Sequence, residues 1–491
     1  MYTRLSENNI ADSADNSCHY GYDRASVELG IVHFGPGAFH RAHQAVFTDD
    51  LLVNGSTEWG ICEVSINSAT VKDKLLPQDN LYTLAILDRI KSHRVIGAIK
   101  EILVAPEDPG LVIERLALPA IKAVTLTVTE KGYCLTPEGG LDFEQESIVH
   151  DLKNKDKPRS VIGFISAGLK ARYNQGVAPF VVISCDNVSD NGKRLKRAVL
   201  DFTMADDPKF AQWLEKEVHF PCTMVDSITP ATNESLCQSV EQYTGFKDNW
   251  PIQREAFSQW VIEDIPNATL PPWSSVGAIV TKDVSGYELT KLRVLNCLHS
   301  TLAFLGCFAG LITVEEAIKR AEIKEFLEKM LHDEIMPTLP KVEGLDKSAY
   351  AKKIIQRFEN PAIRHLLAQI AWDSSQKIPY RIIAIISDNA VASKASPMLC
   401  LSLAAWMKFI VTKVSTGQKL VDPLEDKLVP IAQACDGSNT DVEHFISLEQ
   451  VFPEQLKTNK QFIEDIKSAY RLFNQYQAQD LSTILTTMRS A

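Results

Sequence analysis

The chain lacks a basic block, a Cys-x-x-Cys pair, an internal repeat and a low-complexity tract. Its net charge is −11, and an acidic chain without a basic cluster is not expected to bind nucleic acid or an anionic membrane. The ten cysteines are dispersed. Disulfide frameworks are typical of small secreted domains, so we expect reduced thiols and a cytoplasmic protein.

Long apolar runs are also scarce. The N-terminal sequence MYTRLSENNIADSADNS is polar and has no apolar core, so it does not resemble a signal peptide. The longest apolar run, 295–312, contains Asn296 and His299 and is only about one membrane thickness long. A buried helix explains it better than a membrane span, and we expect a soluble protein.

Strand-like and helical patterns alternate along the first part of the 491 residues. Strand patterns occur at 29–34, 59–64, 81–87, 123–128, 179–185, 259–264 and 276–281, and helical patterns at 159–174 and 192–204. This alternation predicts an α/β fold with a mostly parallel, doubly wound sheet. From Tyr287 onward helical spacing dominates. We expect an α/β domain over 1–284 and a mainly helical domain over 285–491.

The segment GPGAFH places Gly35 and Gly37 between a predicted strand and a helix. A dinucleotide pyrophosphate can bind at such a turn. His40 stands where the usual third glycine would be, so the fingerprint is incomplete, and a plain strand-to-helix turn is the alternative. His40 and His43 could form one pair of metal ligands, but no third ligand has a persuasive spacing, and we expect no metal.

Two more motifs, TVTEKGYC (127–134) and SCDNVSDNG (184–192), each follow a predicted buried strand. They are therefore expected at the carboxyl edge of the sheet, where open α/β folds bind ligands. Asn187 is the candidate functional side chain of the second motif. The alternative is loop chemistry, because Asn and Gly are good turn residues.

The segment GYELTKLRVLNCLHS (286–300) carries four polar residues in an otherwise apolar helix. With Lys291 at zero, Glu288, Asn296 and His299 lie at about 60°, 140° and 80°, so the four share one arc. A desolvated Lys is the expected acid/base when a hydroxyl is oxidised or a carbonyl reduced; the alternative is a buried polar network. Cys297 points about 200° away from His299, which argues against a thiol nucleophile paired with that histidine.

Seven segments occur here in the order seen in the polyol-specific long-chain dehydrogenases, the mannitol dehydrogenase family, and the chain is identified as resembling that family. They are GPGAFHRAHQ, LTVTEKGYC, SCDNVSDNGK, CTMVDSITP, QWVIED, KLRVLNCLHS and WDSSQKIPYR. The resemblance spans roughly residues 28–480 and includes a Lys-x4-Asn-x2-His element. It implies a Rossmann-type N-terminal domain, a helical C-terminal domain, an active site between them, and metal-independent hydride transfer with a nicotinamide.

The resemblance also implies roles for individual residues. Lys291 matches the general acid/base, while Asn187 and Asn296 match the pair that holds the reacting oxygen. His299 matches the histidine that orients the substrate, and Glu288 stands where the family has a carboxylate that relays the proton to solvent.

Cofactor contacts are expected at Gly35, Gly37, Ala38, Phe39, Glu63, Thr129 and Glu130. The loop EVSINSAT offers no acidic residue at its end, where NAD-preferring mannitol enzymes carry one. Glu63 is then the nearest candidate for the ribose hydroxyls. We expect NAD as the cofactor, with NADP as the alternative.

Substrate contacts are expected at Asp226, Gln369, Lys377 and Arg381. The segment QIAWDSSQKIPYR (369–381) resembles the fructuronate reductase branch more than the mannitol branch, which has Arg in place of Gln369 and an aromatic residue in place of Arg381. Lys377 and Arg381 are expected to hold a sugar-acid carboxylate. The alternative is a surface pair flanking a proline turn.

The expected function is therefore NAD-dependent interconversion of D-fructuronate and D-mannonate by a monomer or small homo-oligomer. The alternatives are a mannitol- or arabinitol-type polyol dehydrogenase and an inactive paralogue that binds a sugar acid or nucleotide. Cys297 and Leu298, where the family usually has Gly and Ser, and Ser227, where it usually has Arg, depart from the family pattern.

Overall fold

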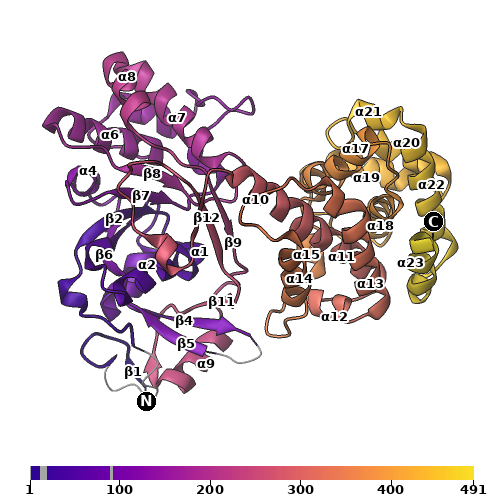
Figure 1. The fold of residues 1–491 in the computed structure, drawn as a ribbon, viewed down its shortest axis with the longest axis horizontal. Helices are drawn as coiled ribbons and strands as arrows, with labels where there is room; N and C mark the ends of the chain where they lie inside the picture. Colours follow the sequence, from indigo (N-terminus) through magenta and orange to yellow (C-terminus); the bar gives the residue numbers. More distant parts are fainter. Residues whose placement is uncertain (1, 11–18, 89–91, 491) are drawn as a thin grey trace. The chain divides into compact units, whose positions relative to one another are not determined.

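The computed structural model describes residues 2–10, 19–88 and 92–490 (Figure 1). Its backbone contacts divide the chain into two compact units, residues 1–285 (unit 1) and residues 286–491 (unit 2). Each unit buries its own set of apolar side chains.

Unit 1 is built on a five-stranded parallel sheet with strand order β6-β3-β2-β7-β8. The strands are β2 (Leu29–Phe34), β3 (Gly60–Ser65), β6 (Ile99–Val104), β7 (Ala123–Leu126) and β8 (Val181–Ser184). β2 comes first in the chain and lies in the middle, so the chain runs outward through β3 and β6 and then in the other direction through β7 and β8. This is the Rossmann arrangement, in which a ligand crevice opens beside the first strand. The predicted doubly wound sheet is confirmed.

Both faces of this sheet are covered. Val32 and Phe34 face an apolar cluster that includes α4 (Pro109–Ala117), α6 (Val161–Gln175) and α7 (Asn191–Asp206) (Figure 1). Ile31 faces the opposite cluster, which includes α2 (Gln44–Val53). Because both faces are buried, the strands read as continuous apolar runs, and the prediction at 29–34 matches the bounds of β2.

Two small sheets complete the described strands of unit 1, with orders β11-β4-β5 and β13-β12-β9. Their strands are β4 (Tyr82–Leu87), β5 (Ser92–Ile96), β9 (Thr223–Asp226), β11 (Ile252–Glu255), β12 (Gln259–Glu263) and β13 (Ile279–Thr281). Three predicted strands (81–87, 259–264 and 276–281) therefore exist, but outside the main sheet. β12 pairs with β9 in the antiparallel sense. A run of apolar residues indicates a strand, but it does not indicate the partner.

Shorter elements connect these layers. They are β1 (Thr3–Arg4), α1 (Ala38–Ala42), α3 (Thr70–Leu75), α5 (Glu146–Lys153), α8 (Pro208–Glu217), α9 (Glu234–Thr244) and β10 (Phe246–Lys247).

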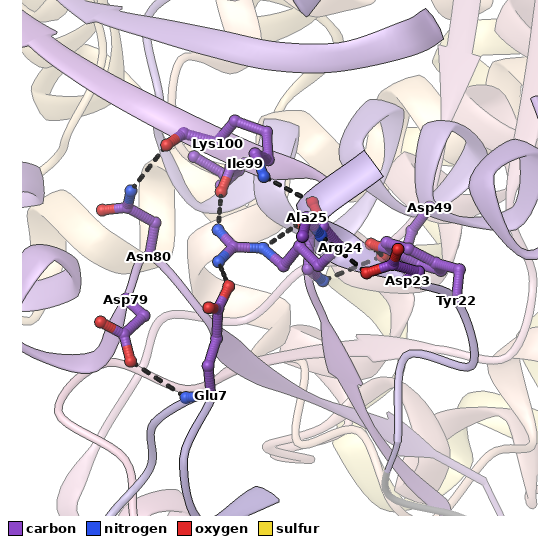
Figure 2. A network of polar contacts seen from close by, with 11 residues as sticks. Glu7, Tyr22, Asp23, Arg24, Ala25, Asp49, Asp79, Asn80, Ile99 and Lys100 are labelled. Atoms are coloured by element: carbon purple, nitrogen blue, oxygen red, sulfur yellow. Dashed lines mark hydrogen bonds and ion pairs between the residues drawn. The ribbon is translucent and has the colours of Figure 1, made fainter. Parts of the chain in front are cut away.

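The described part of the polar N-terminal segment is tied to unit 1 by Arg24 (Figure 2). Its Nε donates to the carbonyl of Gly97 at 2.9 Å and its Nη2 to that of Ile99 at 2.5 Å. Nη1 forms an ion pair with Glu7, and Lys100 Nζ donates to the Arg24 carbonyl at 2.5 Å. These bonds satisfy a buried guanidinium and fix the segment against the strand that begins at Ile99.

Unit 2 is mainly helical. Its α-helices are α10 (Val284–Lys291, which begins just before the boundary), α11 (Cys297–Phe308), α12 (Val314–Ile318), α13 (Ala321–Met330), α14 (Lys347–Phe358), α15 (Leu367–Ile370), α16 (Ser374–Ile378), α17 (Ala384–Val391), α18 (Pro397–Ser415), α19 (Glu425–Ala434), α20 (Asn439–Ile446), α21 (Glu454–Lys457), α22 (Lys460–Gln475) and α23 (Leu481–Ser490). Among the described residues, α18 alone is long and apolar enough to cross a membrane by length and composition, but 67% of that stretch is buried. It packs against α11, α19 and α22 as a core helix.

Three π-helical turns interrupt unit 2: η8 (Leu292–Asn296), η9 (Leu331–Ile335) and η11 (Pro379–Ile383). η8 joins α10 to α11, so the straight helix assumed for the polar arc is wrong. A π turn adds one residue, which rotates the following side chains back by about 100°. Asn296 and His299 then lie at about 40° and −20° from Lys291 instead of about 140° and 80°. The π turn therefore narrows the arc, and such turns are frequent at functional sites.

Candidate functional site

A cavity of 620 Å³ opens in unit 1 where strands of the main sheet end. It is lined by the loops that follow β2 (35–37), β3 (65–68) and β7 (127–129). Its other lining residues are Val71, Lys131, Gly132, Cys134, Gln145, Ser147, Arg159, Ser160, Val161 and Trp250. The strands that follow β2 in the chain are added first on its β3 side and then on its β7 side. This cavity therefore lies at the switch point where Rossmann folds bind a dinucleotide.

The turn at Gly35 and Gly37 has the shape that such a ligand requires. Gly35 has φ +91°, and a Cβ there would lie 2.2 Å from the carbonyl oxygen of Thr127. Gly37 is the N-cap of α1 without a side-chain cap, and the nearest atom to a Cβ there is the Gly35 oxygen at 3.8 Å. The side of Gly37 is thus open to a phosphate. The residues present fit a dinucleotide pyrophosphate.

Asp186 holds the loop that follows β7. Its carboxylate accepts the backbone N–H of Thr129 at 2.8 Å and of Val128 at 3.2 Å, and the hydroxyl of Tyr133 at 2.9 Å. Two loops at the carboxyl edge of the sheet are therefore cross-linked by one side chain, which fixes the cavity wall at 128–129.

Asn191 performs the turn chemistry expected in SCDNVSDNG. Its Nδ2 donates to the carbonyl of Thr223 at 3.0 Å and its Oδ1 accepts the Thr223 N–H at 2.9 Å. The loop that carries Asn187 is thereby tied to β9, which ends at Asp226. Asn187 is exposed and Asp226 is buried, and both stay predicted site residues. Ser227, a departure from the family pattern, donates from Oγ to the carbonyl of Phe257 at 3.0 Å.

The seven expected cofactor residues lie in different places. Gly35, Gly37 and Thr129 line the cavity. Ala38 and Phe39 pack against the apolar cluster on the α2 side of the sheet, and neither is a lining residue within the described chain.

The two acidic members of the set lie outside this lining. Glu130 is exposed, with its carboxylate 3.5 Å from Arg194 Nη1. Glu63 is fully buried, with Oε1 3.1 Å from His40 Nε2. Ser65 and Asn67, which were not among the predicted residues, line the cavity at the end of β3, where Rossmann folds hold a ribose. The sequence could have indicated Ser65 and Asn67 as cofactor residues, because both follow the strand predicted at 59–64.

His40 and His43 have protein partners instead of a shared metal geometry. His40 stacks on His33 with ring centroids 3.3 Å apart, and His43 Nε2 lies 2.9 Å from the carbonyl of Gln259. Within the described residues there is no group of three or more His, Cys, Asp or Glu that could hold a metal ion.

In unit 2, the four polar residues of the arc occupy successive helical segments. Lys291 ends α10 and is 8% exposed, and Asn296 ends the π turn. Glu288 on α10 and His299 on α11 are half-buried.

His299 is held between aromatic rings. Its ring stacks on Phe358 with centroids 5.4 Å apart and meets the edge of His365 at 4.7 Å. Burial, and after it the charges of His365 and Arg381, lower the pKa of His299 well below its usual value, so the ring is neutral. Its Nε2 is buried and makes no hydrogen bond within the described part of the chain. A buried ring nitrogen of this kind suits a group that orients a substrate hydroxyl.

Arg381 lies beside this histidine. Its Nη1 donates to Ser300 Oγ at 3.1 Å, and burial lowers the pKa of its guanidinium to about 10. Lys377 instead donates from Nζ to the carbonyls of Ile370 at 3.4 Å and Trp372 at 2.5 Å. Among the described residues, neither cation forms an ion pair with Asp or Glu.

Gln369, the fourth expected substrate residue, is exposed at α15. The segment 369–381 thus places one cation, Arg381, against the helix that carries His299. It uses the other cation, Lys377, to bind backbone carbonyls near the end of α15.

Cys297 is not a nucleophile in this fold. Its side chain is fully buried, and burial raises the pKa of its thiol to about 12. The thiolate is the reactive form of cysteine, so this thiol is inert near neutral pH. Leu298, the neighbouring departure from the family pattern, is also fully buried.

The comparisons with known proteins agree over both units. A family model described as the mannitol dehydrogenase Rossmann domain matches residues 29–275, and one described as the mannitol dehydrogenase C-terminal domain matches residues 283–473. D-Mannonate oxidoreductase of Escherichia coli (strain K12) is 38% identical, covering 94% of this chain and 96% of the relative. Mannitol 2-dehydrogenase of Neosartorya fischeri is 37% identical, covering 90% of each chain. The structure of Pseudomonas fluorescens mannitol 2-dehydrogenase in ternary complex with NAD and D-mannitol has a TM-score of 0.82 at 30% identity, covering 99% of each chain.

Proposed function

Because this chain belongs to the mannitol dehydrogenase family, we propose that it is an NAD-dependent oxidoreductase that interconverts D-fructuronate and D-mannonate. The coarser part of this proposal, oxidation and reduction at a carbon that carries a hydroxyl, is supported by the names of relatives that match nearly the whole chain. The finer part, the identity of the sugar acid, depends on one side chain.

That side chain is Arg381. Its guanidinium is half-buried, bonds to Ser300 and has no acidic partner among the described residues. Burial makes a cation costly unless an anion balances it. A sugar acid brings a carboxylate, which Arg binds with two parallel hydrogen bonds, whereas a neutral polyol brings no charge. Arg381 beside His299 is the observation that favours a sugar acid.

The cofactor is assigned to the cavity of unit 1. The relative of known structure binds NAD, and the fit of Gly35 and Gly37 to a pyrophosphate supports the same cofactor here. The loops that begin at Ser65 and Thr127 would hold the riboses. When bound, the nicotinamide accepts or supplies the hydride.

The proton is assigned to Lys291. In reduction, its ammonium donates a proton to the oxygen of the substrate carbonyl, and in oxidation the neutral amine takes that proton back. Asn296 is assigned to donate an amide N–H bond to the same oxygen, which stabilises the charge that develops there, and Asn187 keeps the oxygen-holding role that the family resemblance implies. Neutral His299 orients a neighbouring hydroxyl through Nε2, and Glu288 on α10 exchanges the proton with solvent.

A polyol dehydrogenase is the competing function, because relatives named for mannitol and for mannonate match with nearly equal identity, 37% and 38%. The test is oxidation of NADH and NADPH by the purified protein with D-fructuronate, D-tagaturonate, D-fructose and D-xylulose. The proposal expects NADH oxidation with a uronate. Equal turnover of fructose and fructuronate contradicts it. The absence of turnover with all four sugars, while NADH still binds, would favour an inactive paralogue.

A further inference from the structure

A row of buried polar side chains crosses the main sheet one layer below the glycine turn. His33 on β2 lies opposite Glu63 on β3 and Thr125 on β7. His40 on α1 covers the row, with its ring stacked on His33 at 3.3 Å and 14°. All four side chains are at least 99% buried. Apolar side chains would fill this layer at a lower free-energy cost of burial, so the polar row is expected to have a function.

The row contacts one wall of the cavity through His33. The ring Nε2 lies 3.2 Å from the Gly35 oxygen and 3.0 Å from Thr127 Oγ1, and Nδ1 lies 2.7 Å from Thr125 Oγ1. Thr127 Oγ1 itself donates to the Gly35 oxygen at 2.7 Å. His33 therefore helps to fix the carbonyl of the glycine turn.

A second wall is contacted through Arg41. Its Nη1 donates to the carbonyl of Trp250 at 2.8 Å, and its guanidinium lies 4.0 Å from the centre of the Trp250 ring. Trp250 lines the cavity. Arg41 is fully buried, and its Nε and Nη2 make no hydrogen bond within the described chain. Glu63 is among the groups whose charge acts on it.

Glu63 is the group of this cluster whose pKa lies nearest to neutrality. Burial raises the pKa of Glu63 to about 7, although His33 and Arg41 oppose the shift. Burial lowers the pKa of His40 to about 3 and that of His33 well below its usual value. Both rings are neutral, so the 3.1 Å contact of Glu63 with His40 joins a carboxyl group to a neutral imidazole. Neither carboxyl oxygen has a hydrogen bond of good geometry among the described residues.

The charged and titratable groups around Glu63 define what its ionisation changes. They are His33 on β2, Cys62 on β3 itself, His40 and Arg41 on α1, and Tyr82 on β4, with Asp248 acting on Arg41. Burial raises the pKa of Tyr82 well above its usual value, so its hydroxyl stays neutral. Ionised Glu63 offsets the charge of Arg41. When Glu63 is protonated, it no longer offsets the positive charge of Arg41, which lies beneath the cavity.

We propose that Glu63 is a positioning residue that takes up a proton when a dinucleotide binds, so that the affinity for NADH falls as the pH rises. This inference rests on the proposed NAD-dependent function. Glu63 lies two residues before Ser65, about 7 Å along the strand from the cavity edge. A pyrophosphate bound above the glycine turn carries two negative charges, and an ionised carboxylate beneath it would repel them through a medium of low dielectric. The neutral carboxyl together with cationic Arg41 attracts them.

The direction of the effect follows from linkage. The bound pyrophosphate stabilises the protonated carboxyl, so binding raises the pKa of Glu63 above its value in the free protein. Below about pH 6 the free protein already holds the proton, and the Kd for NADH is constant. Above about pH 7, each pH unit raises the Kd by up to about tenfold, until the pKa of the complex is passed.

The test is calorimetric titration of the full-length protein with NADH at pH 6, 7, 8 and 9 in two buffers that differ in ionisation enthalpy. The wild type is expected to take up a measurable fraction of one proton per NADH, with the uptake growing from pH 6 to pH 8. Glu63→Gln is expected to take up none and to bind with a Kd that does not follow pH. The matched control is Glu101→Gln, because Glu101 lies on neighbouring β6, is half-buried and is paired with Arg115.

The outcomes separate this inference from the proposed function. NADH that binds wild type without proton uptake, or a Glu63→Gln protein that keeps the wild-type pH dependence, overturns the role of Glu63 and leaves the proposed function standing. A purely structural role for Glu63 predicts equal weakening of Glu63→Gln at every pH, which also overturns the inference. If Glu63→Gln fails to fold, the proton uptake measured when NADH binds to the wild type still tests the inference. Failure of NADH to bind at any pH overturns both.

Discussion

Arg381 donates a hydrogen bond from Nη1 to Ser300 Oγ across 3.1 Å, which ties the guanidinium to the residue that follows His299. Arg381 and Ser300 are 81 positions apart in the sequence, yet the described structure of unit 2 brings a cation and a neutral histidine together. Charges at Lys377 and Arg381 both contribute to the lowered pKa of His299. This region of unit 2 therefore has the chemistry to bind an anionic, hydroxylated substrate.

Replacing Arg381 tests the carboxylate assignment. Arg381→Leu is expected to lower kcat/KM for D-fructuronate by about 10²-fold, because hydrogen bonds to a charged group are lost. Turnover of neutral ketoses should change by less than about threefold, since they offer no carboxylate. Steady-state kinetics with both classes of substrate measure this difference. The control is Arg471→Gln, an exposed arginine on α22, and a similar loss with every substrate would contradict the assignment.

Lys291 is expected to be needed for the chemical step alone. Lys291→Ala should lower kcat by about 10²- to 10⁴-fold, because general acid/base catalysis contributes that much. Its Kd for NADH should stay within about twofold, since unit 1 holds the cofactor cavity. Fluorescence titration and single-turnover rates measure the two quantities. Lys319→Ala, at an exposed lysine that pairs with Glu315, is the control, and full turnover by Lys291→Ala rules out the acid/base role.

The two glycines of the cofactor turn should respond differently to the same substitution. Gly35→Ala places a Cβ 2.2 Å from a carbonyl oxygen at φ +91°, so we expect a loss of stability of more than about 2 kcal/mol. Gly37→Ala meets its nearest atom at 3.8 Å, so it should fold normally and weaken NADH binding by obstructing the phosphate. Thermal unfolding and NADH titration distinguish the two. Normal NADH affinity in Gly37→Ala would count against a pyrophosphate at this turn.

Cys297 should be dispensable for chemistry. Cys297→Ala is expected to keep kcat within about threefold and to lose about 1 kcal/mol of stability, because a small buried side chain is removed. The thiol pKa of about 12 means that it stays protonated at pH 8. Iodoacetamide should therefore leave the peptide containing residue 297 unmodified in the folded protein. Inactivation that tracks labelling of this peptide would contradict the account.

Much of unit 1 could be predicted because its signals are local. The apolar run at 29–34 and the glycines that follow it specify a strand and a turn in adjacent residues, and β2 has the predicted bounds. The strand at 81–87 was also visible, but its partner β11 comes from residues 252–255. That pairing depends on packing between segments far apart in the chain, and no local pattern encodes it.

The sequence predicted which residues belong to the candidate site, but not how they are arranged in space. The polar arc at 288–299 was visible as a set, whereas the π turn at 292–296 that narrows it was not, because π turns are rare and occur as single turns inside otherwise regular α-helices. Glu63 was the clearest misplacement. Its position near the end of a predicted strand suggested the ribose, but alternation along β3 directs its side chain to the face that α1 covers, next to His40.

The binding of a substrate carboxylate by Arg381 is tested by comparing kcat/KM for D-fructuronate and D-fructose, with NADH, in wild type and Arg381→Leu. We expect the wild type to prefer the uronate by at least about 10²-fold and this preference largely to disappear in the variant. Equal activity of the wild type on both ketoses, or a preference that survives the loss of Arg381, would contradict it.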